Sequence, residues 1–416
     1  MAASHYEQFI QALGYDKLSH RVEELFYAWQ KTKMNYVMSN DDTCWIKTHL
    51  LLDEKLSHAF DEALLIIQSD VDLQKQLSFL QYVYMIGGHP SEWLITQAPH
   101  IKHDLMHTLT FQLMTVLSLI PLARQSFDYR KIEESHMLFN VRHLKGYIKL
   151  KDEEKGIYGI DNYGWTLYLA SFGLIHLSTL HFMHHIYQDP FFFYRHQQTH
   201  EVIAVAKSGI HVRKDGQFNG VNGIDDSWFK TTFSESIQFV KGYLAHPTGV
   251  ITNQLIELDL SVYTCILKPG DMVIDFHIPS KSDYQIEAFN SSLCQAIDFF
   301  KTHFSEYDYK AFWCVSWLYS PQLSQLIENP ESRLLSVANQ GYRLPATPGI
   351  ESINTFVFGS DHPDYQTFSH KTSLQKAVMA YVKENRSINA GCWIYFIDDL
   401  NVFGQTPYIK NDLSMK

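Results

Sequence analysis

Cysteine is scarce in this sequence. The chain has 416 residues and only five cysteines. They are odd in number, lie far apart and never form a C-x-x-C pair: Cys44, Cys265, Cys294, Cys314 and Cys392. A disulfide framework needs paired cysteines, and a cysteine-rich zinc site needs clustered ones. Neither is expected here, and the pattern favours a reducing compartment.

Positive charge is also scarce. The chain has 34 Lys and Arg residues against 45 Asp and Glu residues, which gives a net charge of −11. A protein that binds nucleic acid or an anionic membrane through its overall charge carries a basic surface. We therefore expect no nucleic-acid partner and no membrane partner, although a local basic pocket for a small anion is compatible with this balance.

Long apolar runs are absent as well. The most apolar stretches, residues 113–123 and 165–180, are too short or too polar to span a bilayer. The first residues lack the basic and apolar regions of a secretory signal. The hydrophobic content of 45% and charged content of 19% are typical of a globular protein with a core. These features predict a cytoplasmic protein of about two or three domains.

The two halves of the chain differ in their hydrophobic pattern. In the first half, apolar residues recur at helical spacing, as in Val22, Leu25, Phe26 and Trp29. From about residue 177 strand-like runs alternate with turns, and from residue 272 strands alternate with helices. We predict a helical N-terminal domain over residues 1–155, a mixed α/β (α+β) sheet flanked by helices over residues 156–400, and a C-terminal tail over residues 401–416.

Several elements of the second half follow from this pattern. Hydrophobic strands are expected at residues 272–278, 312–318, 354–359 and 392–397, and helices at residues 283–304, 322–327 and 373–385. Ser282 and Gln285 have the spacing of a capping box at the start of the 283–304 helix.

The junction between the 272–278 strand and the following helix is the first candidate site. A helix N-terminus offers free backbone N–H groups and a positive dipole end, which suit a phosphate or carboxylate. Lys281 and two serines, Ser280 and Ser282, would add donors, and His277 would lie at the carboxyl end of the strand. The alternative is an ordinary capped helix that follows a core histidine, which is the commoner situation.

The 312–318 strand supplies a second candidate site. Cys314 would act as a nucleophile if a base such as His277 lay on a neighbouring strand, as in a hydrolase or a thiol acyl carrier. Tyr319, just beyond the strand, would serve as a general acid. The alternative is that Cys314 is a small buried hydrophobe, as most free cysteines are.

Histidines cluster at His176, His181, His184 and His185. If this segment is a strand, His181 and His185 share one face and His184 points away. The cluster contains no H-E-x-x-H motif and no carboxylate, so we predict no metal site. A metal-dependent enzyme built on His181 and His185 stays open as an alternative.

A series of short motifs in the second half, taken in order, is more specific than any one of them. They are Tyr194-Arg195-His196, Val221-Asn222-Gly223, Pro269-Gly270-Asp271, His277-Ile278-Pro279, Phe299-Phe300 with His303-Phe304, Cys314-Val315-Ser316-Trp317-Leu318 and Pro321-Gln322-Leu323. In this combination the chain resembles a bacterial family called acyltransferase domain-containing, which pairs a helical N-acyltransferase-type N-terminal domain with a GNAT-like C-terminal domain. The resemblance covers roughly residues 160–400.

The resemblance implies an acyl-CoA-dependent N-acyltransferase with a GNAT-like fold. Acetyl-CoA or another acyl-CoA would be the donor and an unidentified amine the acceptor. The sequence does not determine the oligomeric state, and a homo-oligomer is compatible with it. The pyrophosphate would bind at Ile278, Ser280, Lys281, Ser282 and Asp283, while His277 or Tyr319 would transfer protons.

The chain departs from the GNAT pattern at one point. It has no glycine between Phe276 and Ala288, where the usual phosphate loop has two. Without glycine the backbone approaches a pyrophosphate less closely. This departure favours the alternative function, a non-catalytic GNAT-like protein that binds a ligand or regulates a partner.

Overall fold

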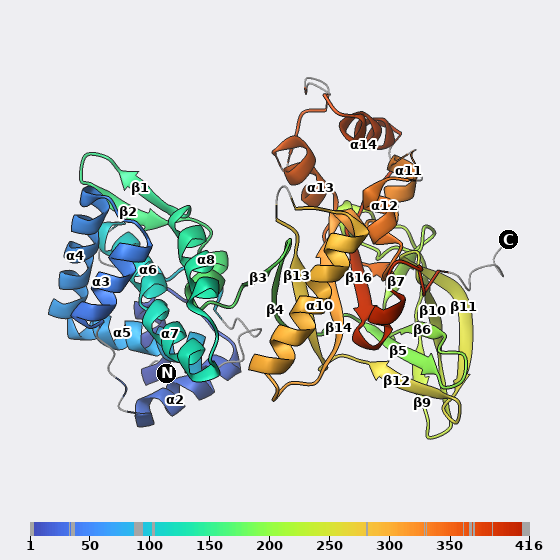
Figure 1. The fold of residues 1–416 in the computed structure, drawn as a ribbon, viewed down its shortest axis with the longest axis horizontal. Helices are drawn as coiled ribbons and strands as arrows, with labels where there is room; N and C mark the ends of the chain where they lie inside the picture. The colour runs from blue at the N-terminus through green and yellow to red at the C-terminus, as the bar shows by residue number, and fades with distance from the viewer. Residues whose placement is uncertain are drawn as a thin grey trace. The chain divides into compact units, whose positions relative to one another are not determined.

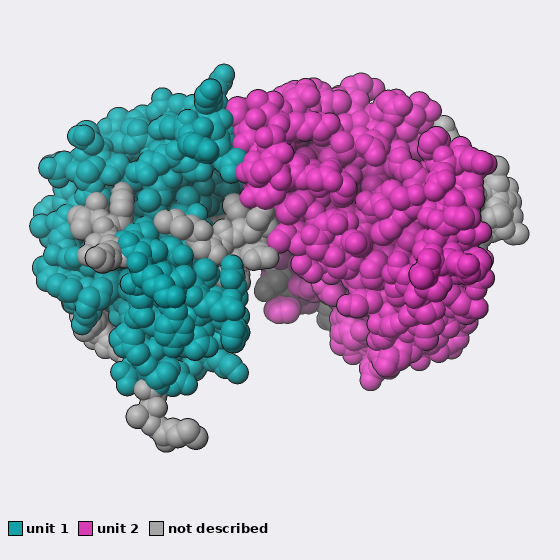
Figure 2. Space-filling model, turned by 90° about the horizontal axis from the view of Figure 1, so that it is seen from below, with its two compact units in different colours: residues 1–176 teal, residues 177–416 magenta. Residues whose placement is uncertain are grey.

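The chain divides into two compact units, residues 1–176 and residues 177–416 (Figure 2). The structure is a computed structural model. It describes residues 4–32, 34, 38–86, 95–101, 105–279, 282–327, 329, 331–360, 362–365, 368, 371–384 and 386–409. Each unit is described by itself.

The first unit is helical, as predicted. Its elements are α1 (His5–Ala12), α2 (His20–Thr32), α3 (Asn40–His49), α4 (Glu54–Ser69), α5 (Val71–Gln81) with the π-helical turn η1 (Tyr82–Ile86), α6 (Leu105–Leu117), α7 (Leu119–Arg130), α8 (Glu134–Lys145) and α9 (Tyr163–Ala170). Side-chain caps define several helix starts, including a capping box at Ser39. Phe26, Trp29 and Phe79 are all buried and pack ring against ring, which joins α2 to α5.

The segment around the predicted boundary at residues 155 and 156 forms a hairpin. Strands β1 (Ile148–Asp152) and β2 (Ile157–Ile160) pair antiparallel, and Gly156 adopts a φ of 65° in the turn between them. The division between the units falls at His176 and Leu177, after the segment where the composition changes. Glycine and proline at Gly87–Pro90 also predict a helix end, and these residues lie outside the described part of the chain.

A mixed sheet of six strands is central to the second unit, and its edge strand β3 (Ile175–Leu177) begins with the last two residues of the first unit (Figure 1). The strand order is β15 (Tyr342–Pro345), β16 (Gly391–Phe396), β14 (Tyr309–Ser316), β13 (Met272–His277), β4 (Leu180–Ile186) and β3. β13 and β14 are parallel and are connected through helix α10 (Ile286–His303), whereas β4, β16 and β15 pair antiparallel with their neighbours. This arrangement confirms the predicted mixed sheet flanked by helices.

A second sheet packs against the first. Its order is β11 (Val250–Asp259), β10 (Phe239–His246), β6 (Val202–Ala206), β5 (Phe191–His196) and β12 (Tyr263–Leu267), with β9 (Phe233–Glu235) also paired to β10. The ring of Phe193 in β5 lies 5.1 Å from Tyr342 and 5.3 Å from Phe396 of the first sheet. A separate hairpin pairs β7 (His211–Arg213) with β8 (Ser227–Lys230). α10 covers the opposite face of the first sheet, so the central strands are enclosed on both sides.

Among the described residues after β14, the α-helices are α11 (Leu323–Leu326), α12 (Arg333–Ala338), α13 (Ile350–Phe358) and α14 (Ser373–Lys383). The strand predicted at residues 354–359 is wrong, because these residues form the end of α13. Ile353 and Phe358 pack against Val378 of α14, so a tertiary contact overrides the strand-like composition of the segment.

The C-terminal segment folds back onto the first sheet. A 3-10 helix, η4 (Ile397–Val402), follows β16, and Tyr408 beyond it is buried. The hydroxyl of Tyr408 donates a 2.7 Å hydrogen bond to Asp399 and accepts one of 3.1 Å from the backbone N–H of Phe396. Within the described part of the chain, no helix has the length and apolar character needed to cross a bilayer.

Candidate functional site

The parallel strands β13 and β14 separate at their carboxyl ends. Their pairing ends where Asp275 lies opposite Trp313. Beyond this point β13 stays paired with β4 as far as His277, and β14 stays paired with β16 as far as Ser316. Each strand is then held from its outer side only, so backbone N–H and C=O groups on the inner sides lie outside the ladder and are available to a ligand.

An aromatic cluster fills the α10 face of this separation. The ring of Phe276 lies 5.3 Å from Trp393 and 5.4 Å from Phe289 of α10. Tyr319 stacks on Trp393 at 5.6 Å. The hydroxyl of Tyr284 donates to the hydroxyl of Tyr319 at 3.2 Å. These contacts make a rigid wall along one side of the separated strands.

Tyr319 is fully buried in that cluster. Burial, with a smaller contribution from Tyr284, raises the pKa of its hydroxyl well above the ordinary value. The hydroxyl is therefore protonated at neutral pH, as a general acid must be. Contact with a substrate requires that the substrate enter between β13 and β14.

Cys314 lies on the same face as Tyr319 and is buried. Because Asp275 faces Trp313 and side chains alternate, His277 points to one side of the sheet and Cys314 to the other. Burial also raises the pKa of the Cys314 thiol well above its ordinary value, so it is not a thiolate at neutral pH. The pairing of a Cys314 nucleophile with a His277 base therefore has no support in this geometry.

The opposite face of β13 carries a histidine–carboxylate pair. Nε2 of His277 lies 3.4 Å from Oδ2 of Asp275. The Asp275 side chain is 8% exposed and that of His277 41% exposed, so the imidazole is accessible while the carboxylate behind it is not. Burial lowers the pKa of His277, but the charge of Asp275 and its hydrogen bond outweigh this effect, and the net pKa lies above the ordinary value.

Trp313 borders the same face and is held in place by two neighbours. Its ring stacks on His185 of β4, with 4.2 Å between centroids and 17° between planes. Its Nε1 donates a 2.6 Å hydrogen bond to Asp189, which also accepts one of 3.3 Å from the Cys392 thiol. Burial raises the pKa of Asp189 against the effect of these bonds, and burial lowers the pKa of His185, which is therefore neutral at pH 7.

The junction after β13 differs in part from the predicted capped helix. α10 begins at Ile286, and its N-cap residue, Gln285, makes no side-chain capping bond, so the predicted capping box of Ser282 and Gln285 is wrong. The Ser282 hydroxyl instead bonds to the carbonyl oxygens of Thr179 and Pro279, each at 2.8 Å. The competing tertiary contact with the β3–β4 turn explains the difference.

The N-terminus of α10 retains features of an anion site. Its first backbone N–H groups lack a side-chain cap, in a helix of 18 residues. Ile278 is partly exposed beside it, while Ser280 and Lys281 lie outside the described residues. Asp283 accepts a 3.1 Å hydrogen bond from the N–H of Gln285, and Glu287 lies in the first turn, so two carboxylates are near the same end.

The histidines of β4 point to both faces of the sheet, and His184 has a packing role on the face covered by α10. His181 and His185 lie on the same face of β4, and His184 points the other way, as the alternation predicts. His184 packs among aromatic rings of α10 and β14, and Tyr309 lies 2.5 Å from its Nδ1. Among the residues that the structure describes, no group of three or more His, Cys, Asp or Glu is arranged to hold a metal ion.

Comparison with known proteins identifies the family to which this fold belongs. Residues 174–395 match the family described as GNAT-like C-terminal domain. The chain belongs to this family. No curated protein sequence matches the chain.

The GNAT-like fold is also found in solved structures that align over both units. A crystal structure of an acyltransferase mutant in complex with octanoyl-CoA has a TM-score of 0.54 and 16% identity, covering 94% of this chain and 98% of that one. An acyltransferase in complex with decanoyl-CoA has a TM-score of 0.54 and 15% identity, covering 95% and 99%. An acyltransferase in complex with decanoyl-CoA and teicoplanin has a TM-score of 0.53 and 16% identity, covering 94% and 99%. At this identity the likeness shows the fold.

Sequence reasoning missed part of the site in the GNAT-like domain. Asp275 was visible two residues before His277, and the strand period alone places both on one face. Asp189 and Trp313, 124 residues apart, meet only because β14 joins the sheet beside β13. No local pattern marks that contact, since it depends on strand order.

Proposed function

We propose that this protein is an acyl-CoA-dependent N-acyltransferase that transfers an acyl group to an amine. The observation that carries the proposal is the separation of β13 and β14 beyond Asp275 and Trp313, in a domain of the GNAT-like family. The separated strands provide inner backbone N–H groups, and the uncapped N-terminus of α10 adds a positive dipole end. The acyl-CoA complexes of the structural neighbours support the choice of donor.

In the proposed reaction the amine nitrogen attacks the thioester carbonyl. A C–N bond forms, the C–S bond breaks, and coenzyme A leaves as the thiol after it gains a proton. Unprotonated His277 accepts the proton that the amine loses, and buried Asp275 stabilises the imidazolium that results. Backbone N–H groups at the separated strands stabilise the oxyanion.

Tyr319 is the proposed donor of the proton to the leaving sulfur. Its pKa is raised by burial, so it holds a proton at neutral pH, and Tyr284 fixes the orientation of its hydroxyl. The proposed pyrophosphate contacts are Ile278, Ser282 and Asp283 with the first turn of α10, together with Ser280 and Lys281. Of these, the Ser282 hydroxyl already bonds to two carbonyl oxygens and the Ser282 backbone N–H donates to the Pro279 carbonyl at 3.2 Å, so the uncapped first N–H groups of α10 are the better candidates.

A second candidate function is a GNAT-like binding or regulatory protein without catalysis. The lack of glycine after β13 and the two carboxylates near the start of α10 favour it, because both weaken a pyrophosphate site.

The five cysteines are all unpaired in the structure, and we propose a cytoplasmic location on that basis.

Calorimetric titration of the whole protein with acetyl-CoA, octanoyl-CoA and free CoA tests the first step. The enzyme hypothesis predicts binding, followed by release of free thiol when primary amines are added. Binding without thiol release across an amine panel would favour the regulatory function. No binding of any acyl-CoA at millimolar concentration would refute the enzyme hypothesis and favour the second function.

A further inference from the structure

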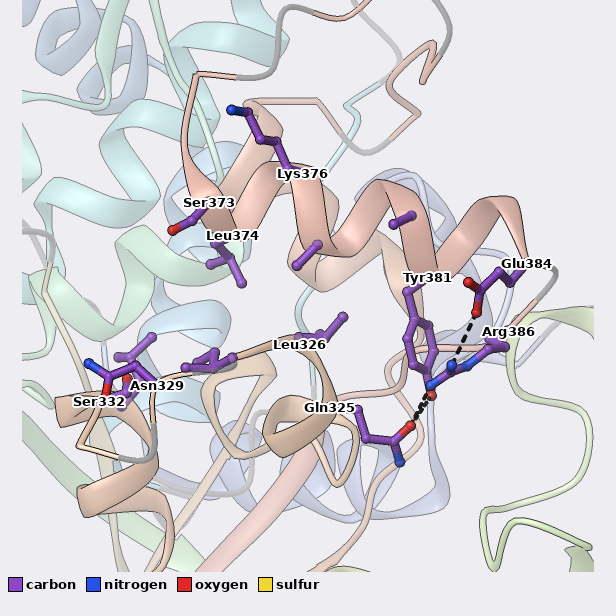
Figure 3. Close-up of a pocket in the computed structure, with 14 residues that line it drawn as sticks. Gln325, Leu326, Asn329, Ser332, Ser373, Leu374, Lys376, Tyr381, Glu384 and Arg386 are labelled. Carbon is purple, nitrogen blue, oxygen red and sulfur yellow. Dashed lines mark hydrogen bonds and ion pairs between the residues drawn. The ribbon is translucent and has the colours of Figure 1, made fainter.

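A groove runs along α14, apart from the separated strands described above. It encloses about 730 Å³, a volume within the usual range for small-molecule sites. Figure 3 shows residues of α14 along one wall and Leu326, Asn329 and Ser332 along the other.

The middle of the groove is apolar. Leu374, Ala377 and Tyr381 recur at steps of three and four residues, so they form one stripe along α14. Leu326 faces this stripe from the other wall (Figure 3), and Leu334 of α12 also lines the groove. The short Ala377 side chain leaves room that a longer residue would fill. From Leu374 to Tyr381 the helix rises by roughly 10 Å, which gives the apolar lane its length.

One end of the groove is polar and ordered. The guanidinium of Arg386 lies 3.7 Å from the ring centroid of Tyr381. Its Nη2 donates a 2.5 Å hydrogen bond to Gln325, and its Nη1 lies 3.1 Å from Glu384 (Figure 3). Three neighbours therefore hold the guanidinium, while 43% of the side chain remains exposed. A guanidinium has five N–H donors, more than these contacts use.

The guanidinium of Arg386 favours an anion. It is the cation at the polar end of the groove, and Glu384 is its carboxylate partner. Lys376 lies nearer the other end of α14, and Figure 3 shows its side chain pointing away from the wall that carries Leu326. Planar guanidinium groups bind carboxylate, phosphate and sulfate groups through paired hydrogen bonds.

We propose that this groove is a binding site for a small amphiphile with one apolar chain and one anionic head group. The chain lies along the stripe of Leu374, Ala377 and Tyr381, and the head group contacts Arg386. The site is distinct from the acyl-donor site, and the proposal does not depend on the proposed acyltransferase activity.

Titration of the full-length protein with two detergents below their micelle concentrations tests this site. Decyl sulfate and decyltrimethylammonium have the same chain and opposite head charges, and neither contains an acyl group. Isothermal calorimetry is expected to show one decyl sulfate per protein, bound at least about tenfold more tightly than the cation, since one charged hydrogen bond is worth about that factor.

Two pairs of variants locate the site. Ala377→Phe fills the lane and is expected to weaken decyl sulfate binding at least about tenfold, whereas Ala377→Ser keeps the space and the binding. Arg386→Gln is expected to remove the preference for the anion, whereas Lys383→Gln, which removes an exposed charge from the same helix outside the groove, preserves it. Thermal unfolding checks that each variant is folded.

Three results would overturn the proposal. The first is no decyl sulfate binding at millimolar concentration. The second is equal binding of the two detergents to the unmodified protein. The third is decyl sulfate binding that survives both Ala377→Phe and Arg386→Gln in folded protein, which would place the detergent elsewhere.

Discussion

His277 Nε2 lies 3.4 Å from Oδ2 of Asp275, two residues earlier on the same strand. The pair exists because strand alternation directs both side chains to one face of β13, at the residue where this strand loses its parallel partner. The carboxylate is buried and the imidazole is accessible, so the proposed proton transfer is assigned to His277, whose pKa Asp275 raises. This division of roles leads to the first two predictions.

Asp275→Asn is expected to shift the pH dependence of acyl transfer. Asp275 holds the pKa of His277 above its ordinary value, and a base must be unprotonated, so the rate of the unmodified enzyme rises as the pH passes upward through that raised pKa. Without the carboxylate, burial dominates and lowers the pKa of His277. The acidic limb of kcat/KM should then move to lower pH, measured by thiol release at fixed acyl-CoA.

Asp298→Asn is the matched control, since Asp298 is exposed on α10. It should leave the acidic limb where it is. An Asp275→Asn profile with an unchanged or raised limb would mean that His277 is not the group titrating in the rate.

His277→Gln is expected to lower kcat by about 10²–10⁴-fold, the usual contribution of a general base. Because the imidazole is proposed to act on the amine and not to hold the donor, the acyl-CoA dissociation constant should stay nearly unchanged. Stopped assays of amide formation and calorimetry separate the two quantities. His58→Gln, at an exposed position on α4, is the control. A loss of acyl-CoA binding equal to the loss of rate would assign His277 to binding.

The sequence predicted those features of the fold that depend on neighbouring residues, and it did not predict those that depend on contacts between distant segments. The helical first half, the β13–α10–β14 order and the alternation of histidines in β4 follow from periodicity, which is local. The end of α13 was expected to be a strand, because its aromatic and β-branched residues favour one and only the packing against α14 decides otherwise. Asp189 and Trp313 could not be paired, since their hydrogen bond depends on the order of strands in the sheet.

Asp189→Asn is expected to change the pH dependence of stability. Burial raises the pKa of Asp189 in the folded protein, so the protonated form is favoured there. Asp189 therefore contributes most to the free energy of unfolding below pH 3.8, the ordinary pKa that applies to the unfolded chain. This contribution falls as the pH rises from 3.8 through the higher pKa of the folded protein. The total loss is about 1.36 kcal/mol for each unit by which the two pKa values differ. Urea unfolding between pH 4 and 7 should show the unmodified protein losing stability relative to the variant as the pH rises.

The slope of that difference is the measurement, because the amide also changes the bonds to Trp313 and Cys392 at every pH. A constant difference would show that Asp189 is charged throughout the range. Asp298→Asn, at an exposed site, should give a nearly flat difference.

Gly391→Ala is expected to destabilise the second unit. Gly391 begins β16 between Ser316 of β14 and Pro345 of β15, and an added Cβ would overlap the backbone carbonyl group of Tyr319. Backbone on both sides leaves little room to relax, so the cost should be roughly 1–3 kcal/mol, as for other overpacked cores. Gly164→Ala, in helix α9 of the other unit, has its nearest neighbour at 3.5 Å and should be neutral or slightly stabilising. Thermal unfolding of both variants checks this, and an unchanged midpoint for Gly391→Ala would show that the turn holding Tyr319 can move away from β16.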